Sequence, residues 1–567
     1  MANDAGRKEV DYQRDEDFIG CWWGLLATMG YICGKSEEMA ELKYPIGIQT
    51  FSKIIENGYT YVDKTRFVGE LTTRSKYVFL NRPRRFGKSL FTSTLHCYFD
   101  GRRDLFKGLA LDSMDVDWTP HPVLHFDFNN GNYEVEEGIH DILDYALARY
   151  ERQYGCDGSA AGLSIRFQAL IERAYEKTGR GVVILIDEYD KPLLGLEENP
   201  EIFERNRAVL KSFFGTLKTM DRYIRFAFLT GVARFSKVSI FSDLNQLQDI
   251  SIDDRYADIC GWTEEELIET FLPGVRELAA LREETVENTV AVLRNYYDGY
   301  KFSANGSRLY NPFSVLRALE AKSVQPYWFA TGTPTFLAKR VKSSGLGAAR
   351  MDGIACDEEE LLEVGLGKDN PVPLMFQAGY LTIDSYDSRR RRYILRFPNQ
   401  EVEIGFSKFL LPVYVPEATK RYGPFSIFSF QDDLYDGHPE QFMERLGTLF
   451  KDFPYEDMNE VMYRSVTYLI CRLCDTEPQA ERHSFKGRSD LEVLTTNYVY
   501  LFEFKYDESA EVAIAQIHDR DDAGRHAFDP RQVYLIGVNC DSKRATRALS
   551  WLIELIPKNN KDEAVSK

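Results

Sequence analysis

The stretch 77–90, YVFLNRPRRFGKSL, limits the fold of this 567-residue chain more than any other. An apolar run stops at a polar loop that ends in Gly87-Lys88-Ser89, and apolar residues at helical spacing follow. A strand, a loop and a helix in that order turn backbone N–H groups and the positive end of the helix toward an anion. Lys88 can reach the terminal phosphates of a nucleotide, and the Ser89 hydroxyl can bind Mg²⁺. The stretch therefore predicts a phosphate-binding loop.

The match to the P-loop pattern GxxxxGK[ST] is incomplete. Arg82 stands where the pattern has its first glycine. A basic loop that merely caps a helix is the alternative interpretation. In the nucleotide interpretation, Arg82, Arg84 and Arg85 serve the phosphates or a neighbouring subunit.

Two further strands support the nucleotide interpretation. Residues 181–188, GVVILIDE, contain five consecutive aliphatics, which is typical of a strand buried on both faces of a parallel sheet. The strand ends in Asp187 and Glu188, at the end where open α/β sheets place their ligands. Another buried strand, 223–231, ends near Thr230. Strands that alternate with helices predict a doubly wound α/β domain with a parallel sheet.

These strand ends predict an ATP site with Mg²⁺. Asp187 would hold Mg²⁺ through water, Glu188 would polarise the attacking water, Thr230 would sense the γ-phosphate, and Arg234 would stabilise transferred charge. The alternative for the two acids is a pair that stabilises a helix N-terminus. The predicted nucleotide-binding residues are Arg85, Gly87, Lys88, Ser89, Asp187, Thr230 and Arg234, with Ser89 and Asp187 at the metal and Glu188 catalytic.

A second set of charged residues lies near the C-terminus. Glu503 and Lys505 are two apart on a predicted strand and so share a face, and Asp490 on the preceding strand can meet them across the hairpin. Two carboxylates suit Mg²⁺ or Mn²⁺, and a lysine beside the metal can orient a water for attack on a phosphodiester. Gln516 on the next helix would orient a neighbour, and Glu460 is an auxiliary candidate ligand. An exposed Glu–Lys surface pair is the alternative.

The remaining chain shows a coarser pattern. A turn into a strand is predicted at 59–62, and helices begin after 261 with a capping box of Thr263 and Glu266. A β-hairpin is predicted at 376–402, and its Arg389–Arg392 tip is either solvated or contacts phosphates. The C-terminal pattern is a helix at 459–474, strands at 484–494 and 498–505, a helix at 509–520, a strand at 532–538 and a last helix through Trp551. We expect an extension at 1–40, a P-loop domain at 41–258, a helical region with a hairpin at 259–430 and an α/β domain at 431–560 whose order of helices and strands fits a nuclease core.

Composition narrows the function classes. The net charge of −18 argues against a nucleic-acid coat protein but leaves room for a local basic cleft. Nine scattered cysteines, an odd number, favour reduced thiols and a cytoplasmic protein, with Cys471 and Cys474 in the core. The apolar stretch 20–34 is too short to cross a bilayer, so we expect no membrane attachment.

Together these motifs are similar to a prokaryotic family with an AAA-ATPase-like N-terminal domain and a C-terminal nuclease-like domain of the PD-(D/E)xK superfamily. The resemblance spans about residues 43–540 and is carried by YPIGIQTFSKIIENGYTYVDKT, FLNRPRRFGKSL, VILIDEYDKPL, FLTGVARFSKVSIFSDLN, YYDGYKF, LYNPFSVL, YWFATGTPTFL, GYLTID, FPNQEV, GRSDLEV and FEFK. It implies ATP binding by Lys88, Ser89 and Asp187. It also implies a metal-dependent nuclease site at Asp490, Glu503 and Lys505, in an α/β restriction-endonuclease-like domain. Arg234 and Lys237 match a family motif that follows the strand ending near Thr230.

The family shares the arginine in place of the first P-loop glycine. The chain departs from it by Ser489-Asp490 instead of Pro-Asp and by its N-terminal extension with Trp22-Trp23, which leaves a homo-oligomer or a partner protein open. We therefore expect an ATP-binding and ATP-hydrolysing protein coupled to a Mg²⁺-dependent nuclease that acts on nucleic acid, DNA rather than RNA. The resemblance associates such proteins with phage defence or mobile elements. The alternative is a nucleotide-dependent switch whose nuclease-like domain only binds nucleic acid or a partner protein.

Overall fold

The fold is taken from a computed structural model. It describes residues 42–156, 162–196, 199–234, 246–329, 335–348, 351–362, 370–414, 427–450, 459–474, 476–483, 488–541 and 549–557. The expectations for the 1–40 extension and for Lys237 lie outside the described residues. Residues Lys43–Lys567 form one compact unit.

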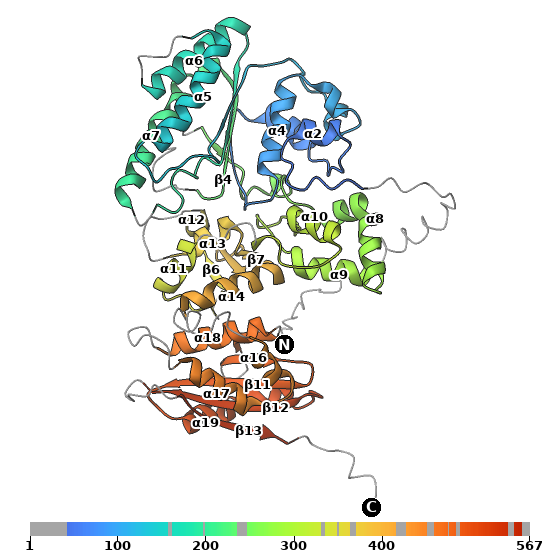
Figure 1. The fold of residues 1–567 in the computed structure, drawn as a ribbon, viewed down its shortest axis with the longest axis vertical. Coiled ribbons are helices and arrows are strands. Elements are labelled where there is room, and N and C mark those ends of the chain that lie inside the picture. The colour runs from blue at the N-terminus through green and yellow to red at the C-terminus, as the bar shows by residue number, and fades with distance from the viewer. Residues whose placement is uncertain are drawn as a thin grey trace, which may run out of the picture. The chain divides into compact units, whose positions relative to one another are not determined.

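The first sheet has five parallel strands in the order β2-β3-β4-β1-β5. Every residue of β1 and β3 is buried, as the continuous apolar runs predict. Figure 1 shows α5, α6 and α7 on one face of this sheet and α2 and α4 on the other, which confirms the doubly wound α/β domain. The strands are β1 Tyr77–Asn81, β2 Val123–Asp127, β3 Val182–Asp187, β4 Ile224–Gly231 and the unpredicted β5 Gln248–Asp249; the helices are α2 Phe51–Glu56, α3 Arg66–Arg74, α4 Lys88–Phe99, α5 Gly138–Tyr154, α6 Leu163–Thr178 and α7 Pro200–Thr219.

The strand predicted at 59–62 is wrong. This segment forms no ladder with a sheet strand, and its Thr60 amide donates to the Lys43 carbonyl instead. The apolar side chain of Tyr61 packs against the ring of Phe51, at 5.4 Å between centroids. The alternation of apolar residues that suggested a strand therefore reflects packing of an extended loop on α2.

A mostly helical middle region follows. Thr263 caps α8 by the predicted capping box with Glu266. The predicted hairpin is confirmed at its centre, but its ends are wrong, because α13 occupies its start and α14 begins at Gln400. The three-residue strand β6 completes a sheet in the order β6-β8-β7. The elements are α8 Glu264–Leu281, α9 Val286–Tyr297, α10 Pro312–Ala321, α11 Thr335–Ser343, β6 Ile354–Cys356, α12 Glu358–Leu362, α13 Val372–Ala378, β7 Thr382–Asp387, β8 Arg392–Arg396 and α14 Gln400–Tyr414.

The C-terminal region holds a mixed five-stranded sheet in the order β13-β12-β11-β10-β9. Its β11 and β12 are parallel and the other pairs are antiparallel, with α18 packed on β9–β11 and α19 on β11–β13. Cys471 and Cys474 are buried, as predicted. The elements are α16 Phe428–Tyr435, α17 Pro439–Phe450, α18 Glu460–Leu473, β9 Glu477–His483, β10 Arg488–Leu494, β11 Tyr498–Tyr506, α19 Ala510–Arg520, the 3₁₀-helix η8 Asp522–His526, β12 Gln532–Cys540 and β13 Leu549–Ile556.

The helix predicted through Trp551 is wrong, because this segment is the edge strand β13. Its burial alternates, with Leu549 buried and Ser550 and Leu552 exposed, and it pairs antiparallel with β12. The apolar sequence LSWLIELI is compatible with the period of a helix or of a strand. It forms a strand because β12 offers a side on which it can pair. Among the described residues, no helix has the length and apolarity to span a membrane.

Candidate functional site

The predicted phosphate-binding loop joins β1 to α4. Gly87 caps the helix with φ 98°, in the left-handed region that glycine adopts without strain, and the Phe91 amide donates to its carbonyl at 2.9 Å. Lys88 and Ser89 are the first two residues of α4, where helix amides have no intrahelical acceptor. The loop opens into a cavity of about 560 Å³. Helix end and cavity together can take an anionic ligand.

Lys88 is almost fully buried and joins this loop to the end of β3. Its Nζ donates to the carbonyls of Arg82 and Pro83, at 2.9 and 3.2 Å, and lies 3.4 Å from Glu188 Oε1. Glu188 has φ 54° and a side chain that lines the cavity. A cation so positioned beside helix amides favours phosphate.

Asp187 and Thr230 lie buried at the ends of β3 and β4. Burial raises the pKa of Asp187 to about 6, while a hydrogen bond from Ser89 opposes that rise. Asp187 Oδ1 and Thr230 Oγ1 are buried and have no hydrogen-bond partner among the described residues. Such groups are costly unless something pairs with them. The oxygens of Ser89 and Asp187 therefore fit a hydrated Mg²⁺ on a nucleotide.

Three further charged residues lie near the loop, and each has contacts of its own. Arg234 pairs with Asp249 at 2.7 Å, and its amide donates to Gln377 Oε1 at 2.6 Å, so the structure does not bring it to the Lys88–Asp187 group. Arg85 lines the cavity, with its guanidinium 5.0 Å from the centre of the Phe313 ring. Asp190 is fully buried and accepts the amides of Val232 and Ala233, which fixes the chain after β4.

Arg82 serves neither phosphates nor a neighbouring subunit, which corrects the expectation from sequence. Its guanidinium is buried and donates to the carbonyls of Asn81, Ser251, Tyr256 and Ala257, at 2.7–3.3 Å. Burial lowers its pKa to about 10, so it stays charged at neutral pH. The residue that replaces the first P-loop glycine thus ties the base of the loop to the segment after β5.

The C-terminal candidate residues converge where the start of β10 lies beside the end of β11. Glu503 is fully buried, and Lys505 Nζ donates to its Oε1 at 3.2 Å. Asp490 Oδ2 accepts the Phe504 amide at 2.8 Å, next to Glu503 along the strand. Burial and then the charge of Asp490 raise the pKa of Glu503, while Lys505, Arg520 and a hydrogen bond from Gln516 oppose the rise. The structure therefore brings together Asp490, Glu503, Lys505 and Gln516.

Comparison with known proteins matches both halves of this arrangement. Residues 45–241 match the family described as "Predicted AAA-ATPase", and residues 458–550 match the PD-(D/E)XK nuclease superfamily. A protein of Azotobacter chroococcum mcd 1, described as an uncharacterized protein in the vnfD 5' region, is 37% identical over 533 residues, which cover 91% of this chain and 99% of that one. The chain belongs to the family of AAA-ATPase-like proteins with a C-terminal PD-(D/E)XK nuclease-superfamily domain.

Two arginines in the nuclease-superfamily domain were not predicted. Arg520 Nη1 donates to both Glu503 oxygens at 3.1 Å, and Arg464 Nη1 lies 3.1 Å from Asp490 Oδ1. Arg520 follows Gln516 by four residues on α19, a spacing that could have indicated it. Glu460, the auxiliary candidate, lies at the start of α18, where its charge helps burial to raise the pKa of Cys540.

The carboxylates of Asp490 and Glu503 fit Mg²⁺. Asp490 and Glu503 are two carboxylates, and Mg²⁺ in proteins usually binds one or two carboxylates and keeps several waters. Within the described ranges, no three His, Cys, Asp or Glu side chains group to hold a metal. The protein alone would thus supply only part of the coordination, which leaves room for water or phosphate oxygens.

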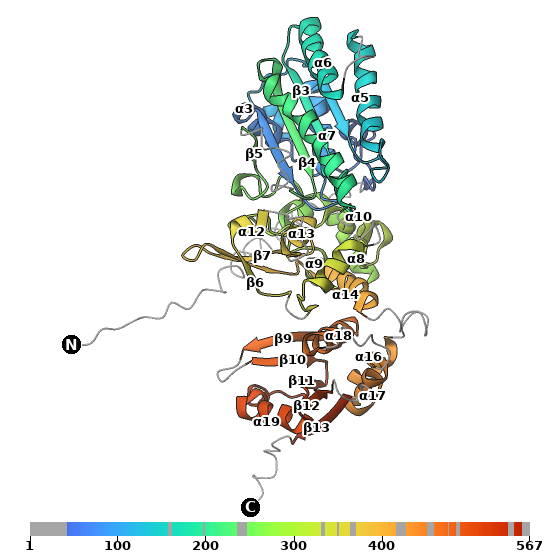
Figure 2. The same ribbon diagram turned by 90° about the vertical axis from the view of Figure 1, so that its left-hand side faces the viewer.

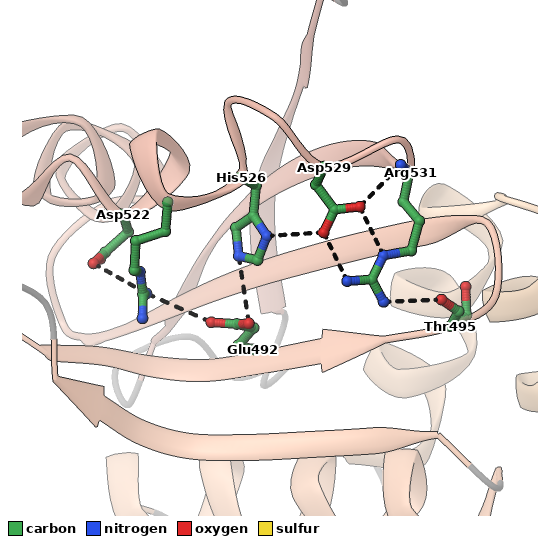
Figure 3. A network of polar contacts seen from close by, with 7 residues as sticks. Glu492, Thr495, Asp522, His526, Asp529 and Arg531 are labelled. Atoms are coloured by element: carbon green, nitrogen blue, oxygen red, sulfur yellow. Dashed lines mark hydrogen bonds and ion pairs between the residues drawn. The ribbon is translucent and has the colours of Figure 1, made fainter. Parts of the chain in front are cut away.

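A partly buried ionic network joins Glu492 of β10 to the segment after α19 (Figure 3). Glu492, two residues after Asp490, lies 3.3 Å from His526 Nε2, and His526 Nδ1 lies 3.3 Å from Asp529. Arg531 binds both oxygens of Asp529, at 2.9 and 2.7 Å, and holds the pKa of that carboxyl well below its usual range. The network fastens the segment after α19 to β10.

Several residues that line the ATPase-like cavity were also missed. Asp127 ends β2 in register with Asp187, so its strand-end position was a usable signal. Trp262 and Phe313 reach the cavity from the middle region and had no local signal. The missed lining residues are Lys64, Asp127, Asn129, Asn130, Trp262 and Phe313.

Replacing Arg82 with the glycine of the P-loop pattern should destabilise the protein. We expect Arg82→Gly to lower the free energy of unfolding by about 2–3 kcal/mol, because four buried carbonyls lose a charged donor. Urea unfolding followed by circular dichroism measures the change. Arg85→Gly is the matched control and should stay within about 0.5 kcal/mol of wild type, since Arg85 is exposed and has φ 70°. Equal effects of both substitutions would contradict the role assigned to Arg82.

Proposed function

We propose that this protein binds and hydrolyses ATP at the loop cavity and that ATP controls a Mg²⁺-dependent nuclease site at Asp490, Glu503 and Lys505. The observation that carries the proposal is the position of the helix α14, which is connected to the P-loop through Trp328 and to Asp490 through α18. Its Glu401 reaches the residues that hold the P-loop, and its Glu403 reaches α18 of the nuclease-superfamily domain.

At the first site, the chain's own groups suit nucleoside triphosphate hydrolysis. Lys88 would neutralise the terminal phosphates beside the amides of α4, and Ser89 and Asp187 would hold Mg²⁺, which supplies charge stabilisation when bound. Glu188, in the cavity wall, would orient the attacking water. Thr230 lies buried at the end of β4, the strand between β1 and β3.

At the second site, the residues suit phosphodiester hydrolysis. Asp490 and Glu503 would hold Mg²⁺ or Mn²⁺, which would polarise the scissile phosphate when bound. Lys505 lies beside Glu503 and can orient a water or stabilise the charge that develops on phosphate. Gln516 and Arg520 hold the Glu503 carboxylate from α19. Nucleic acid is the polymer that such a site would cleave, and we favour DNA.

The P-loop side of the connection runs through a tryptophan. The Trp328 indole donates to the Arg84 carbonyl at 3.1 Å, and the Trp328 amide donates to Glu401 Oε1 at 2.7 Å. The Ser314 hydroxyl donates to the other Glu401 oxygen at 2.7 Å. Burial raises the pKa of Glu401 to about 7, opposed by these hydrogen bonds. A movement of the P-loop backbone at Arg84 would therefore move Trp328 and change its hydrogen bond to Glu401 at the start of α14.

The nuclease side of the connection begins two residues later. Glu403 accepts the Tyr468 hydroxyl at 3.0 Å and pairs with Arg472, both on α18, which packs against α14. The same α18 carries Arg464, the partner of Asp490. A shift of α18 that lengthens the Arg464–Asp490 pair would free a carboxylate for the metal. We therefore expect ATP to raise the cleavage rate.

A cleavage assay with and without ATP tests the proposal. Single- and double-stranded DNA and RNA are incubated with the full-length protein and Mg²⁺, and ATP should raise cleavage by about fivefold or more. Tyr468→Phe and Glu403→Gln should abolish most of this increase, because they loosen the α14–α18 contact, while ATP turnover stays near wild type. Tyr98→Phe is the matched control, since its hydroxyl also makes one bond, to the Asp117 carbonyl, but within the ATPase-like domain.

A full ATP effect in both contact variants would contradict coupling through α14. The absence of cleavage of every nucleic acid, with either Mg²⁺ or Mn²⁺, would sink the nuclease assignment. That outcome would leave the second candidate, a nucleotide-dependent switch whose nuclease-like domain only binds nucleic acid or a partner protein. The arginine partners of both carboxylates favour this candidate, because they compete with a metal.

A further inference from the structure

The β7–β8 hairpin of the middle region carries a run of like charge at its tip. Residues 389–392 are four consecutive arginines, and all four are exposed. The Arg390 side chain is 76% exposed. Figure 2 shows the hairpin that contains β7 projecting beyond the helices of the middle region. The tip is therefore accessible to a large partner.

The backbone of this tip is fixed. Asp387 Oδ1 accepts the amides of Arg389 and Arg390, at 3.0 and 3.1 Å, which closes the turn. Arg391 takes the left-handed conformation with φ 52°. The rings of Tyr386 and Tyr393 pack across the two strands, with centroids 4.5 Å apart. A partner that binds the arginines would order few backbone groups, so little conformational entropy is lost.

The charge of the tip is poorly compensated by the protein. Arg390 lies 3.7 Å from Asp387, and the described part of the chain gives the other three arginines no ion pair. Several other surface arginines of this acidic chain are paired, as Arg102 is with Asp104 and Arg282 with Glu284. Like charges held together cost free energy, and a polyanion would relieve that cost.

The base of the hairpin adjoins the α14–α18 contact. Arg396, at the end of β8, pairs with Asp384 of β7 at 3.1 Å. Asp352 accepts the Phe397 amide at 3.1 Å. Burial raises the pKa of Asp352, and the charges of Arg472 and Arg396 oppose that rise, so the hairpin base and α18 share one electrostatic neighbourhood. A nucleic acid that extends from the nuclease-superfamily domain past α18 would therefore reach the hairpin.

We propose that Arg389–Arg392 bind the phosphate backbone of the double-stranded DNA on which the nuclease site acts, an inference that rests on the proposed function. Guanidinium groups bind phosphates bidentately, and a two-stranded ribbon fits the major groove of a duplex. A duplex is favoured over a single strand, because Tyr393 is buried and Tyr386 packs against it, so the tip offers no open ring on which bases could stack.

Salt-dependent binding tests this role. The full-length protein is titrated into a fluorescein-labelled DNA duplex in EDTA, so that nothing is cleaved, and Kd is measured by anisotropy at several salt concentrations. Replacing all four arginines by glutamine should weaken binding about tenfold or more and lower the slope of log Kd against log salt by about 2–4, close to one for each lost phosphate contact. ATP binding should stay unchanged, which shows that the variant folds.

A second quadruple variant controls for net charge. Arg102, Arg173, Arg282 and Arg317 are surface arginines that each pair with a carboxylate, and their change to glutamine removes the same total charge. Its salt slope should match wild type. A hairpin variant that binds DNA like wild type, or no more weakly than this control, would overturn the inference and leave the nuclease proposal standing. Tighter binding of a labelled single strand than of the duplex would overturn the duplex preference, and a wild type that neither binds nor cleaves nucleic acid would overturn the proposed function itself.

Discussion

Lys505→Ala should reduce cleavage of nucleic acid by about 10²- to 10³-fold, with ATP turnover unchanged. Lys505 is the only lysine that the described chain places beside Asp490 and Glu503. Its Nζ lies 3.2 Å from Glu503 Oε1. Its loss removes the cation that orients water or stabilises developing charge, whereas the carboxylates remain. Single-turnover cleavage of labelled DNA in Mg²⁺ measures the effect.

Two further variants make this result specific. Glu503→Gln should reduce cleavage similarly, because a neutral amide is a weaker ligand for Mg²⁺ than a carboxylate. His518→Ala on the exposed side of α19 should leave cleavage near wild type, since His518 pairs with Glu554 on the surface. Cleavage by Lys505→Ala at the wild-type rate would remove Lys505 from the chemistry and point to a nuclease site elsewhere in the chain, or to a contaminant.

Lys88→Ala should reduce ATP turnover by about 10²- to 10³-fold. The variant loses the cation at the N-terminus of α4 that would face the terminal phosphates, and it also frees the carbonyls of Arg82 and Pro83. Phosphate release measures turnover. Thermal unfolding with and without Mg²⁺-ATP measures binding, because a ligand that binds the native state alone raises its stability, by about 2.7 kcal/mol at 100 times Kd.

Lys76→Ala is the control for this prediction. Lys76 lies just before β1, is partly exposed and pairs with Asp221, so its loss should change neither turnover nor the ATP-induced stabilisation. Wild-type turnover in Lys88→Ala would contradict the nucleotide assignment of the loop. If Lys88→Ala loses ATP turnover but its cleavage rate still rises with ATP, binding rather than hydrolysis controls the nuclease site.

The contacts of α14 are the physical basis of the proposed control of the nuclease site by ATP. Glu401 and Glu403 are buried carboxylates on one helix, and burial raises the pKa of each to about 7. Each is held by a small number of strong hydrogen bonds, so the helix cannot shift without exchanging these partners. Discrete partners of this kind suit an element with two arrangements. The contacts support coupling, and the contact variants test it.

Local sequence was sufficient for the elements whose pattern has one solution. The short aliphatic run of β3, rich in β-branched residues, predicts a fully buried strand, and Thr263 with Glu266 makes a cap from two residues on one turn. Gly87-Lys88-Ser89 at a strand–helix junction likewise carries its own geometry. The two strands and the helix that carry Asp490, Glu503, Lys505 and Gln516 were also predicted, because strand alternation places Glu503 and Lys505 on one face.

What sequence alone left open depends on partners far along the chain. LSWLIELI became a strand because β12 had an unpaired edge, and Arg82 became a buried structural residue because the segment after β5 brought carbonyls to it. Trp328 meets Arg84 across 244 residues, and no periodic pattern encodes such a contact. The sequence by itself determined the strands β1, β3 and β4, the cap of α8 and most of the chemical groups of both candidate sites, since these follow from neighbours along the chain. Only the tertiary structure decided which arginines hold which groups and that α14 is connected to the P-loop through Trp328 and to Asp490 through α18, because those contacts exist only after the chain has folded.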